Sequence, residues 1–191
     1  MKTQGKSVSD EELVEKIRRE DTELYREIVG RYQQGLYRYL RHFTNRPDAA
    51  EDLVQDVLIK AYRNLFGSDT RKKFSSWIYR IAHNEGVNYI RKTGKRKSVS
   101  FEDLAVPHPN ENDSPEEELV REEIRRNLTE CLDEMKTKYR EALVLHYIEE
   151  KPYKEISDIL RVPMGTVGTL IARGKNMLRA ICQRKGGDLS P

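Results

Sequence analysis

Aromatic, amide and cationic side chains alternate along residues 74–92, a pattern that suits contact with unpaired nucleic-acid bases. The aromatic members are Phe74, Trp77, Tyr79 and Tyr89, and the polar members are Arg80, Asn84, Asn88, Arg91 and Lys92. Bases stack on aromatic rings, and amide side chains hydrogen-bond to base edges. Trp77 has an alternative role as the core anchor of a small helical domain, and the sequence leaves both roles open.

The C-terminal region has the spacing of a helix-turn-helix. Residues 153–160 predict one helix, 161–163 a turn, and 165–184 a second helix. Apolar groups fall at the positions that such a motif buries, namely Ile156, Leu160, Val162 and Val167, and the small Ser157 permits close helix approach. The second helix carries cations but no acid, as expected of a helix lying against phosphates. An ordinary helical hairpin is the alternative.

A third candidate surface is acidic. The helix expected after Pro47, which extends to residue 65, has an apolar stripe on one side, formed by Ala50, Leu53, Val54, Val57, Leu58, Ala61, Tyr62 and Leu65. The opposite face carries Asp48, Glu51, Asp52, Gln55 and Asp56. Such a face is either simply solvated or a docking surface for a basic partner.

The charges are segregated along the chain, although the formal net charge is only +3. Residues 71–97 are basic, with Glu85 as the single acid. Residues 98–123 are acidic, with Arg121 as the single cation, and the charged residues of 161–185 are all Lys or Arg. Two cationic surfaces joined by an acidic segment indicate a protein that grips a polyanion at two places. The acidic segment is either a solvated tether or a weak mimic of nucleic acid.

Other functional classes lack their signatures. No apolar run is long enough to span a membrane, and the polar N-terminus lacks a signal core, so we expect a cytoplasmic protein without membrane insertion. There is no phosphate-binding loop, and His42, His83, His108 and His146 show no ligand spacing, so we expect neither metal nor other cofactor. Cys131 and Cys182 have no CxxC pattern, and we expect two packed or idle thiols rather than a disulfide or zinc site.

The helical periodicity predicts an all-α chain of two small helical domains joined by a flexible acidic linker. Ser9 and Glu12 form a capping box for a short first helix, and Ser114, Pro115 and Glu117 mark another helix start. The expected segments are an N-terminal extension with a short helix (1–21), a first domain (22–93), the linker (94–113), a second domain (114–185) and a disordered tail (186–191).

Two stretches resemble a known family. Residues 49–62 (AAEDLVQDVLIKAY) and 74–84 (FSSWIYRIAHN) are similar to domain two of bacterial extracytoplasmic-function (ECF) sigma factors of the sigma-70 family. Residues 139–145 (YREALVL), 153–157 (YKEIS) and 162–167 (VPMGTV) resemble their domain four. The two sets stand in the family's order and together cover residues 22–184.

The resemblance implies a promoter-specificity subunit of RNA polymerase without catalysis of its own. The acidic face would bind the clamp helices of core polymerase. Domain two would melt and recognise the −10 element; the residues implied are Ser68, Lys72, Lys73, Trp77, Arg80, Asn84, Asn88, Arg91 and Lys92. The loop over residues 67–73 would hold a flipped base. An anti-sigma protein is a further possible partner.

Domain four would place its second helix in the major groove at the −35 element; the residues implied are Gly165, Thr166, Gly168, Thr169, Arg173 and Lys175. The helix departs from the family pattern Thr-Val-Lys-Ser-Arg-Leu, because Gly168 and Leu170 stand where cations are usual. Leu170 could touch a thymine methyl group or join the core. We therefore expect an unusual −35 sequence, recognised with less help from arginine. Arg161 replaces the commoner turn glycine, so it either adopts a left-handed conformation or the turn differs.

Two other functions remain possible from the sequence. One is a helix-turn-helix regulator that binds duplex DNA without polymerase, although such a protein needs neither the acidic face nor the aromatic helix. The other is a DNA-acting enzyme. Asp52 and Asp56 could coordinate magnesium, but no third convergent ligand is evident.

Overall fold

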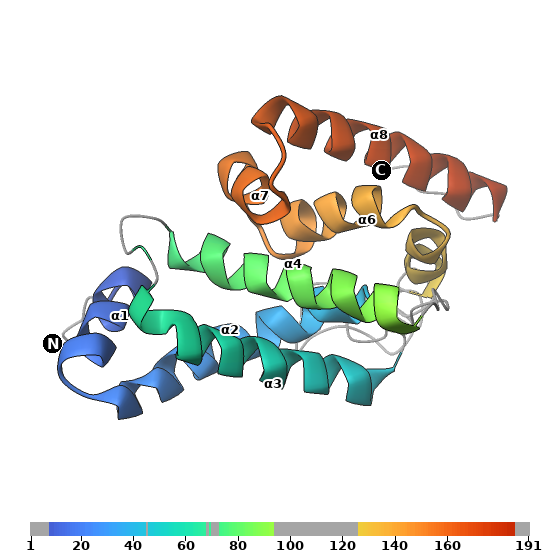
Figure 1. Cartoon of the computed structure of the whole chain (residues 1–191). Helices are drawn as coiled ribbons and strands as arrows, with labels where there is room; N and C mark the ends of the chain where they lie inside the picture. The colour runs from blue at the N-terminus through green and yellow to red at the C-terminus, as the bar shows by residue number, and fades with distance from the viewer. Residues whose placement is uncertain (1–7, 45, 68, 70–72, 94–125, 186–191) are drawn as a thin grey trace, which may run out of the picture.

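The computed structural model describes residues 8–44, 46–67, 69, 73–93 and 126–185, and every regular element in these ranges is a helix (Figure 1). The helices form two bundles, and α4 lies between the rest of the first bundle and the second (Figure 1). The all-α prediction is confirmed. The predicted linker (94–113), the helix start at Ser114 and the tail (186–191) lie outside the described residues.

The first bundle is built from four α-helices and two short 3₁₀ turns. They are α1 (Asp10–Arg19), η1 (Thr22–Leu24), α2 (Tyr25–Arg41), α3 (Pro47–Asn64), η2 (Leu65–Gly67) and α4 (Phe74–Thr93). The predicted capping box begins α1, where Ser9 accepts from the Glu12 backbone N–H and Glu12 accepts from the Ser9 N–H. Leu13, Val14 and Ile17 of α1 are buried, so this helix contributes to the core of the first bundle.

The second bundle contains the two helices expected over residues 153–160 and 165–184. It comprises a helix over residues 126–133, α6 (Thr137–Leu143), the π-helical turn η3 (Val144–Ile148), α7 (Tyr153–Leu160) and α8 (Met164–Arg184). Its core includes Leu143, Leu145, Ile156 and Val167. The long helix α8 packs against both α6 and α7 and so holds this bundle together.

The two bundles meet through buried polar groups. Glu141 and Glu149 of the second bundle are almost fully buried. The Tyr39 hydroxyl donates to Glu141, and the Tyr79 hydroxyl donates to Glu149. The oxygen–oxygen distance is 2.5 Å in each case. Burial, together with the neighbouring carboxylates, raises the pKa of both tyrosines, so they remain protonated donors.

Charged groups complete this junction. Arg38 donates to Glu149 over 3.1 Å, and Arg140 donates to the backbone carbonyl of His42 over 2.6 Å. Burial and the Arg140 charge hold the pKa of His42 well below its usual value. Each buried charge therefore has a partner from the other bundle or from its own, as burial requires.

The expectation of two unpaired thiols is wrong, because Cys131 and Cys182 form a disulfide. The helix over 126–133 lies beside the C-terminal turns of α8, which brings together two cysteines 51 residues apart in sequence. Ion pairs reinforce the same seam, since Lys185 contacts Glu130 and Glu134 at 3.3 and 3.0 Å. Local spacing carried no signal for this pairing, which depends on helix packing.

Candidate functional site

The acidic face of α3 forms an exposed ridge. Its five members are all exposed: Asp48, Glu51, Asp52, Gln55 and Asp56. The other side of the helix anchors it, because Leu53, Val54 and Val57 are buried in the core. Asp48 pairs with Arg46, whose hydrogen bond lowers the pKa of that carboxyl. The remaining acids are directed to solvent and are available to a cationic partner.

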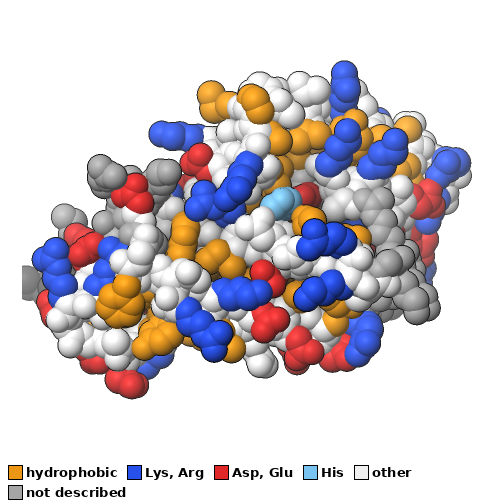
Figure 2. Space-filling view, in the orientation of Figure 1, with side chains coloured by type: hydrophobic (Ala, Val, Ile, Leu, Met, Phe, Trp, Pro, Cys, Tyr) orange, Lys and Arg blue, Asp and Glu red, His pale blue; other side chains and the backbone are white. Residues whose placement is uncertain are grey.

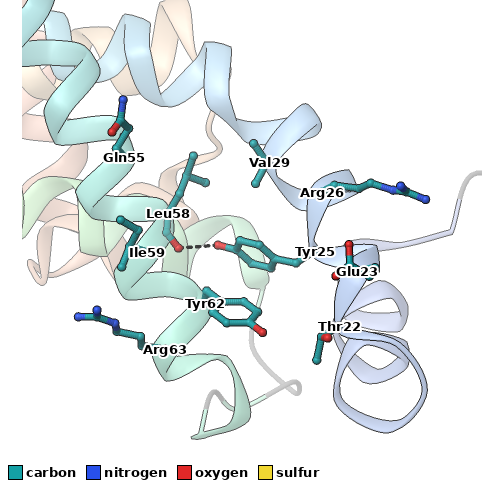
Figure 3. A pocket seen from close by; sticks show the side chains of 10 residues that line it. All are labelled: Thr22, Glu23, Tyr25, Arg26, Val29, Gln55, Leu58, Ile59, Tyr62 and Arg63. Carbon is teal, nitrogen blue, oxygen red and sulfur yellow. Dashed lines mark hydrogen bonds between the residues drawn. The ribbon is translucent and has the colours of Figure 1, made fainter.

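An apolar groove of about 560 Å³ adjoins this acidic ridge (Figure 3). Gln55 is common to both, and Tyr25, Leu58, Ile59 and Tyr62 contribute to the lining. The Tyr25 hydroxyl donates to the Leu58 carbonyl over 2.7 Å, and its ring meets Tyr62 edge-on at 4.9 Å. Burial raises the pKa of Tyr25, which keeps this donor protonated.

Sequence reasoning missed the groove. It assigned Tyr62 to the buried stripe of α3, yet Tyr62 is 39% exposed and Ile59 is 48% exposed. A signal was available, because Ile59 stands four residues after Gln55 and so falls on the polar side of the helix. The combined surface is a row of carboxylates that continues into exposed apolar groups.

The surface expected to bind unpaired bases gathers on one side of α4. Trp77, Arg80 and Asn84 line a polar cleft of about 590 Å³, together with Lys60, Arg63, Asn64, Gly67, Ile81 and Glu85. Lys60 and Glu85 form an ion pair across it. Lys and Arg side chains are spread over this face of the molecule, with some acids between them (Figure 2).

Other expected members extend from the cleft along α4. Asn88 is half-buried and accepts a 3.2 Å hydrogen bond from the exposed Arg91, and Lys92 is exposed one residue further on. Lys73 is exposed before the helix begins. Ser68 and Lys72 lie outside the described residues, as does most of the loop expected to hold a flipped base.

The aromatic residues of α4 differ in burial. Tyr89 is half-buried, and its hydroxyl accepts from the Thr44 hydroxyl at 3.1 Å. Phe74 and Tyr79 are buried in the core and present no stacking face. Trp77 is half-buried, packed against the core with its ring 5.3 Å from that of Phe74, and it also lines the cleft. The two roles considered for Trp77 are therefore compatible, because the ring packs against the core and is still partly exposed in the cleft.

The helix-turn-helix forms as predicted from α7 and α8. Arg161 adopts the left-handed conformation, with φ 55° and ψ 45°, so it takes the turn position that glycine usually occupies. The Ser157 hydroxyl donates to the Val162 carbonyl over 2.6 Å and ties the turn to α7. Leu170 is only 9% exposed and belongs to the core, which settles its two alternatives.

The expected duplex-contacting residues lie along the outer side of α8. Gly165, Thr166, Thr169, Arg173 and Lys175 are exposed, and Gly168 is half-buried. The Thr169 hydroxyl donates to the Gly165 carbonyl over 3.0 Å. This outer side is thus an exposed surface made mostly of small residues, with Arg173 and Lys175 beyond them.

Within the described residues, no three His, Cys, Asp or Glu side chains are grouped so as to hold a metal ion. The same part of the chain contains no helix with the length and apolar character needed to cross a membrane.

Comparison with known proteins identifies the family. The sequence matches the family model for sigma-70 region 2 over residues 28–96 and that for sigma-70 region 4 over residues 125–178. It is 31% identical over 176 residues to the ECF RNA polymerase sigma factor SigW of Bacillus subtilis (strain 168), with 87% of this chain and 92% of that protein covered.

Solved structures share the fold. The structure of CnrH in complex with the cytosolic domain of CnrY matches with a TM-score of 0.68 at 21% identity, over 92% of this chain and 97% of that one. The sigma factor RpoE, solved with the anti-sigma factor NepR from Bartonella quintana, matches with a TM-score of 0.63 at 23% identity, over 83% and 96%. The chain therefore belongs to the sigma-70 family and is an ECF RNA polymerase sigma factor, which directs promoter recognition.

Proposed function

We propose that the acidic ridge of α3, together with the adjoining apolar groove, binds core RNA polymerase. The ridge supplies Asp48, Glu51, Asp52, Gln55 and Asp56, and the groove adds Ile59 and Tyr62. Carboxylates steer a basic partner and fix its register, whereas buried aromatic contacts supply most of the affinity. The observation that carries the proposal is the exposure of this mixed surface on the same chain as a helix-turn-helix.

The cleft and outer face of α4 are proposed to open and hold the −10 element. A base that leaves the duplex loses roughly a few kcal/mol of stacking free energy. Stacking on the Trp77 ring and hydrogen bonds to the Asn84 and Asn88 amides would offset that loss. Arg80, Arg91, Lys73 and Lys92 would attract the strand phosphates, and the same role is proposed for Ser68 and Lys72 in the preceding loop.

The outer face of α8 is proposed to bind the −35 element through Gly165, Thr166, Gly168, Thr169, Arg173 and Lys175. A convex helix face free of acids fits the width of the major groove. The corresponding domain limits are 22–93 and 114–185, with 1–21 as an extension, 94–113 as a linker and 186–191 as a tail. The sigma factor would act in the cytoplasm, on the nucleoid, through polymerase and without catalysis of its own.

An anti-sigma protein is a further proposed partner. RpoE, which shares this fold, was solved with the anti-sigma factor NepR. The polar junction between the two bundles gives such a protein a surface to compete for, since Glu141 and Glu149 would need new partners once the bundles separate.

Run-off transcription tests the proposal directly. Purified core polymerase is assayed with and without this protein on DNA selected from a promoter library by the reconstituted holoenzyme. We expect specific transcripts only when the protein is present. Duplex binding without any effect on initiation would instead favour a regulator that acts without polymerase.

A charge reversal tests the ridge. Asp52→Arg combined with Asp56→Arg should abolish co-purification with core polymerase, because both exposed carboxylates would be replaced by cations. The matched control is Glu20→Arg with Glu27→Arg, which reverses two exposed acids outside the ridge. Circular dichroism verifies the fold, and equal co-purification of the two variants would refute the assigned docking surface.

A further inference from the structure

The first half of α8 presents methyl groups and apolar surface where a recognition helix usually presents charge. Residues 164–172 contain no charged residue. Met164, in the first turn, is 58% exposed, one of the most exposed large apolar side chains in the described part of the chain. An exposed apolar side chain in the first turn of a helix proposed to enter the major groove is available to contact a base edge.

Tyr153 of α7 extends this apolar surface. It is 37% exposed, and a Cβ built on Gly168 would meet only one atom within 4 Å, Cε2 of the Tyr153 ring at 3.6 Å. The glycine is therefore not demanded by packing, since a side chain would fit there in ordinary contact. Its effect is to leave the edge of the Tyr153 ring uncovered beside the helix backbone.

Three of the polar side chains nearby have contacts within the protein. The Thr169 hydroxyl donates its hydrogen to the Gly165 carbonyl over 3.0 Å, which leaves its methyl group as the outward feature. Arg173 lies by Tyr139 and lowers the pKa of that phenol through a hydrogen bond. The Lys175 ammonium stands 6.0 Å from the centre of the Tyr147 ring. Within residues 164–172 the Thr166 hydroxyl is thus the one side-chain donor left for guanine or adenine edges.

We propose that this face of α8 recognises its promoter element through thymine methyl groups, with Met164, Tyr153 and Thr169 as specificity-determining contacts. In the major groove the 5-methyl group is the feature that marks thymine, and apolar side chains are its natural partners. The proposal rests on the assignment of α8 to the −35 element and names the base chemistry that it takes. It predicts an upstream element rich in A·T pairs.

The test uses reconstituted holoenzyme and a promoter library randomised over the −35 region. The selected element is then synthesised with each thymine replaced by deoxyuridine, which removes one methyl group and leaves base pairing intact. We expect binding to weaken roughly fourfold for each contacted methyl group, the value of one buried CH₂ group. Unchanged binding to every deoxyuridine duplex would overturn the proposal.

Matched variants assign the contacts. Met164→Ala should weaken binding to the thymine duplex and abolish the deoxyuridine effect at one position. Thr169→Val keeps the methyl group without the hydroxyl and should retain the effect, whereas Thr169→Ser keeps the hydroxyl without the methyl and should lose it. The reverse order for the Thr169 pair would show hydroxyl-based recognition and would refute the assignment.

The proposed function and the thymine-methyl proposal are overturned by different results. If no sequence is selected and no transcript is made, the sigma-factor assignment of the two bundles fails. If holoenzyme selects a guanine-rich element and transcribes from it, that assignment stands and the thymine-methyl proposal is wrong. Val87→Ala, an exposed apolar residue of α4, is the control that should leave the deoxyuridine effect unchanged.

Discussion

Helices α4 and α8 each carry a proposed nucleic-acid surface, yet the protein holds them in opposite ways. α4 is packed on one side by α2 and α3 and on another by α7, so only a strip of it faces solvent. α8 packs against α6 and α7 on one side only, and a disulfide near its end fixes it to the helix over 126–133.

The glycines of the two helices show what this difference means. A Cβ on Gly86 of α4 would lie 2.4 Å from the Phe43 ring, whereas a Cβ on Gly168 of α8 would meet only Tyr153 at 3.6 Å. Packing therefore dictates a glycine at position 86 of α4 but not at position 168 on the outer face of α8. The outer face of α8 is free to change its sequence, and with it the DNA that it binds, without cost to the core.

The largest expected effect concerns the disulfide of α8. Reduction should destabilise the second bundle by about 4 kcal/mol, the chain-entropy value for a loop of this length. Urea unfolding with and without a phosphine reductant measures the change, and mass spectrometry reports the state of Cys131 and Cys182. Cys131→Ala with Cys182→Ala is the control, which should be insensitive to reductant. Identical curves for the native chain would show that packing alone holds α8.

Gly86→Ala comes next. The added methyl group overlaps the Phe43 ring, and overpacking of this kind costs about 1–3 kcal/mol. Gly30→Ala is the matched control, since nothing lies within 4 Å of its built Cβ, and we expect it to be neutral or stabilising. Phe43→Leu in the Gly86→Ala background should recover part of the loss. Equal stability of the two alanine variants would mean that α4 can shift freely.

The second packed side of α4 is tested by Tyr79→Phe, which removes the hydroxyl that donates to Glu149 across the junction. Loss of one hydrogen bond to a buried charge should cost about 1.5–3 kcal/mol of unfolding free energy at most, because Arg38 still pairs with Glu149. Tyr62→Phe is the control on an exposed tyrosine. If both variants unfold at the same urea concentration, the junction does not contribute to stability.

The smallest effect is expected at Gly168→Ala. Alanine has a higher helix propensity by about 1 kcal/mol, and no contact opposes the added methyl group, so the variant should be slightly more stable. Gly174→Ala on the inner face of α8 is the counterpart, because its Cβ would meet Leu143 at 3.1 Å. Thermal unfolding of the two variants compares their stabilities. Lower stability of Gly168→Ala would contradict the prediction, because it would show that Gly168 has a packing role.

The helices and their order could be predicted from the sequence, because apolar periodicity, caps and prolines act locally. Pro47 begins α3, Ser9 caps α1, and the spacing around Ser157 produced the helix-turn-helix. The same local patterns placed the acidic ridge on one face of α3. Resemblance in two separated segments then identified the family, which the comparisons confirmed.

Other features were decided only by the tertiary structure, because they depend on residues far apart in the chain. Periodicity could not show that Tyr79 lies in the core while Trp77 lines a cleft, or that Ile59 and Tyr62 border an open groove. Periodicity also could not show that Cys131 pairs with Cys182, or that the buried Glu149 accepts a hydrogen bond from Tyr79. Neighbouring residues along the chain dictate which helices form and which face of each is apolar, since those are local properties. Only packing between helices decided which polar groups are buried, which apolar groups stay exposed, and so which surfaces a partner can reach.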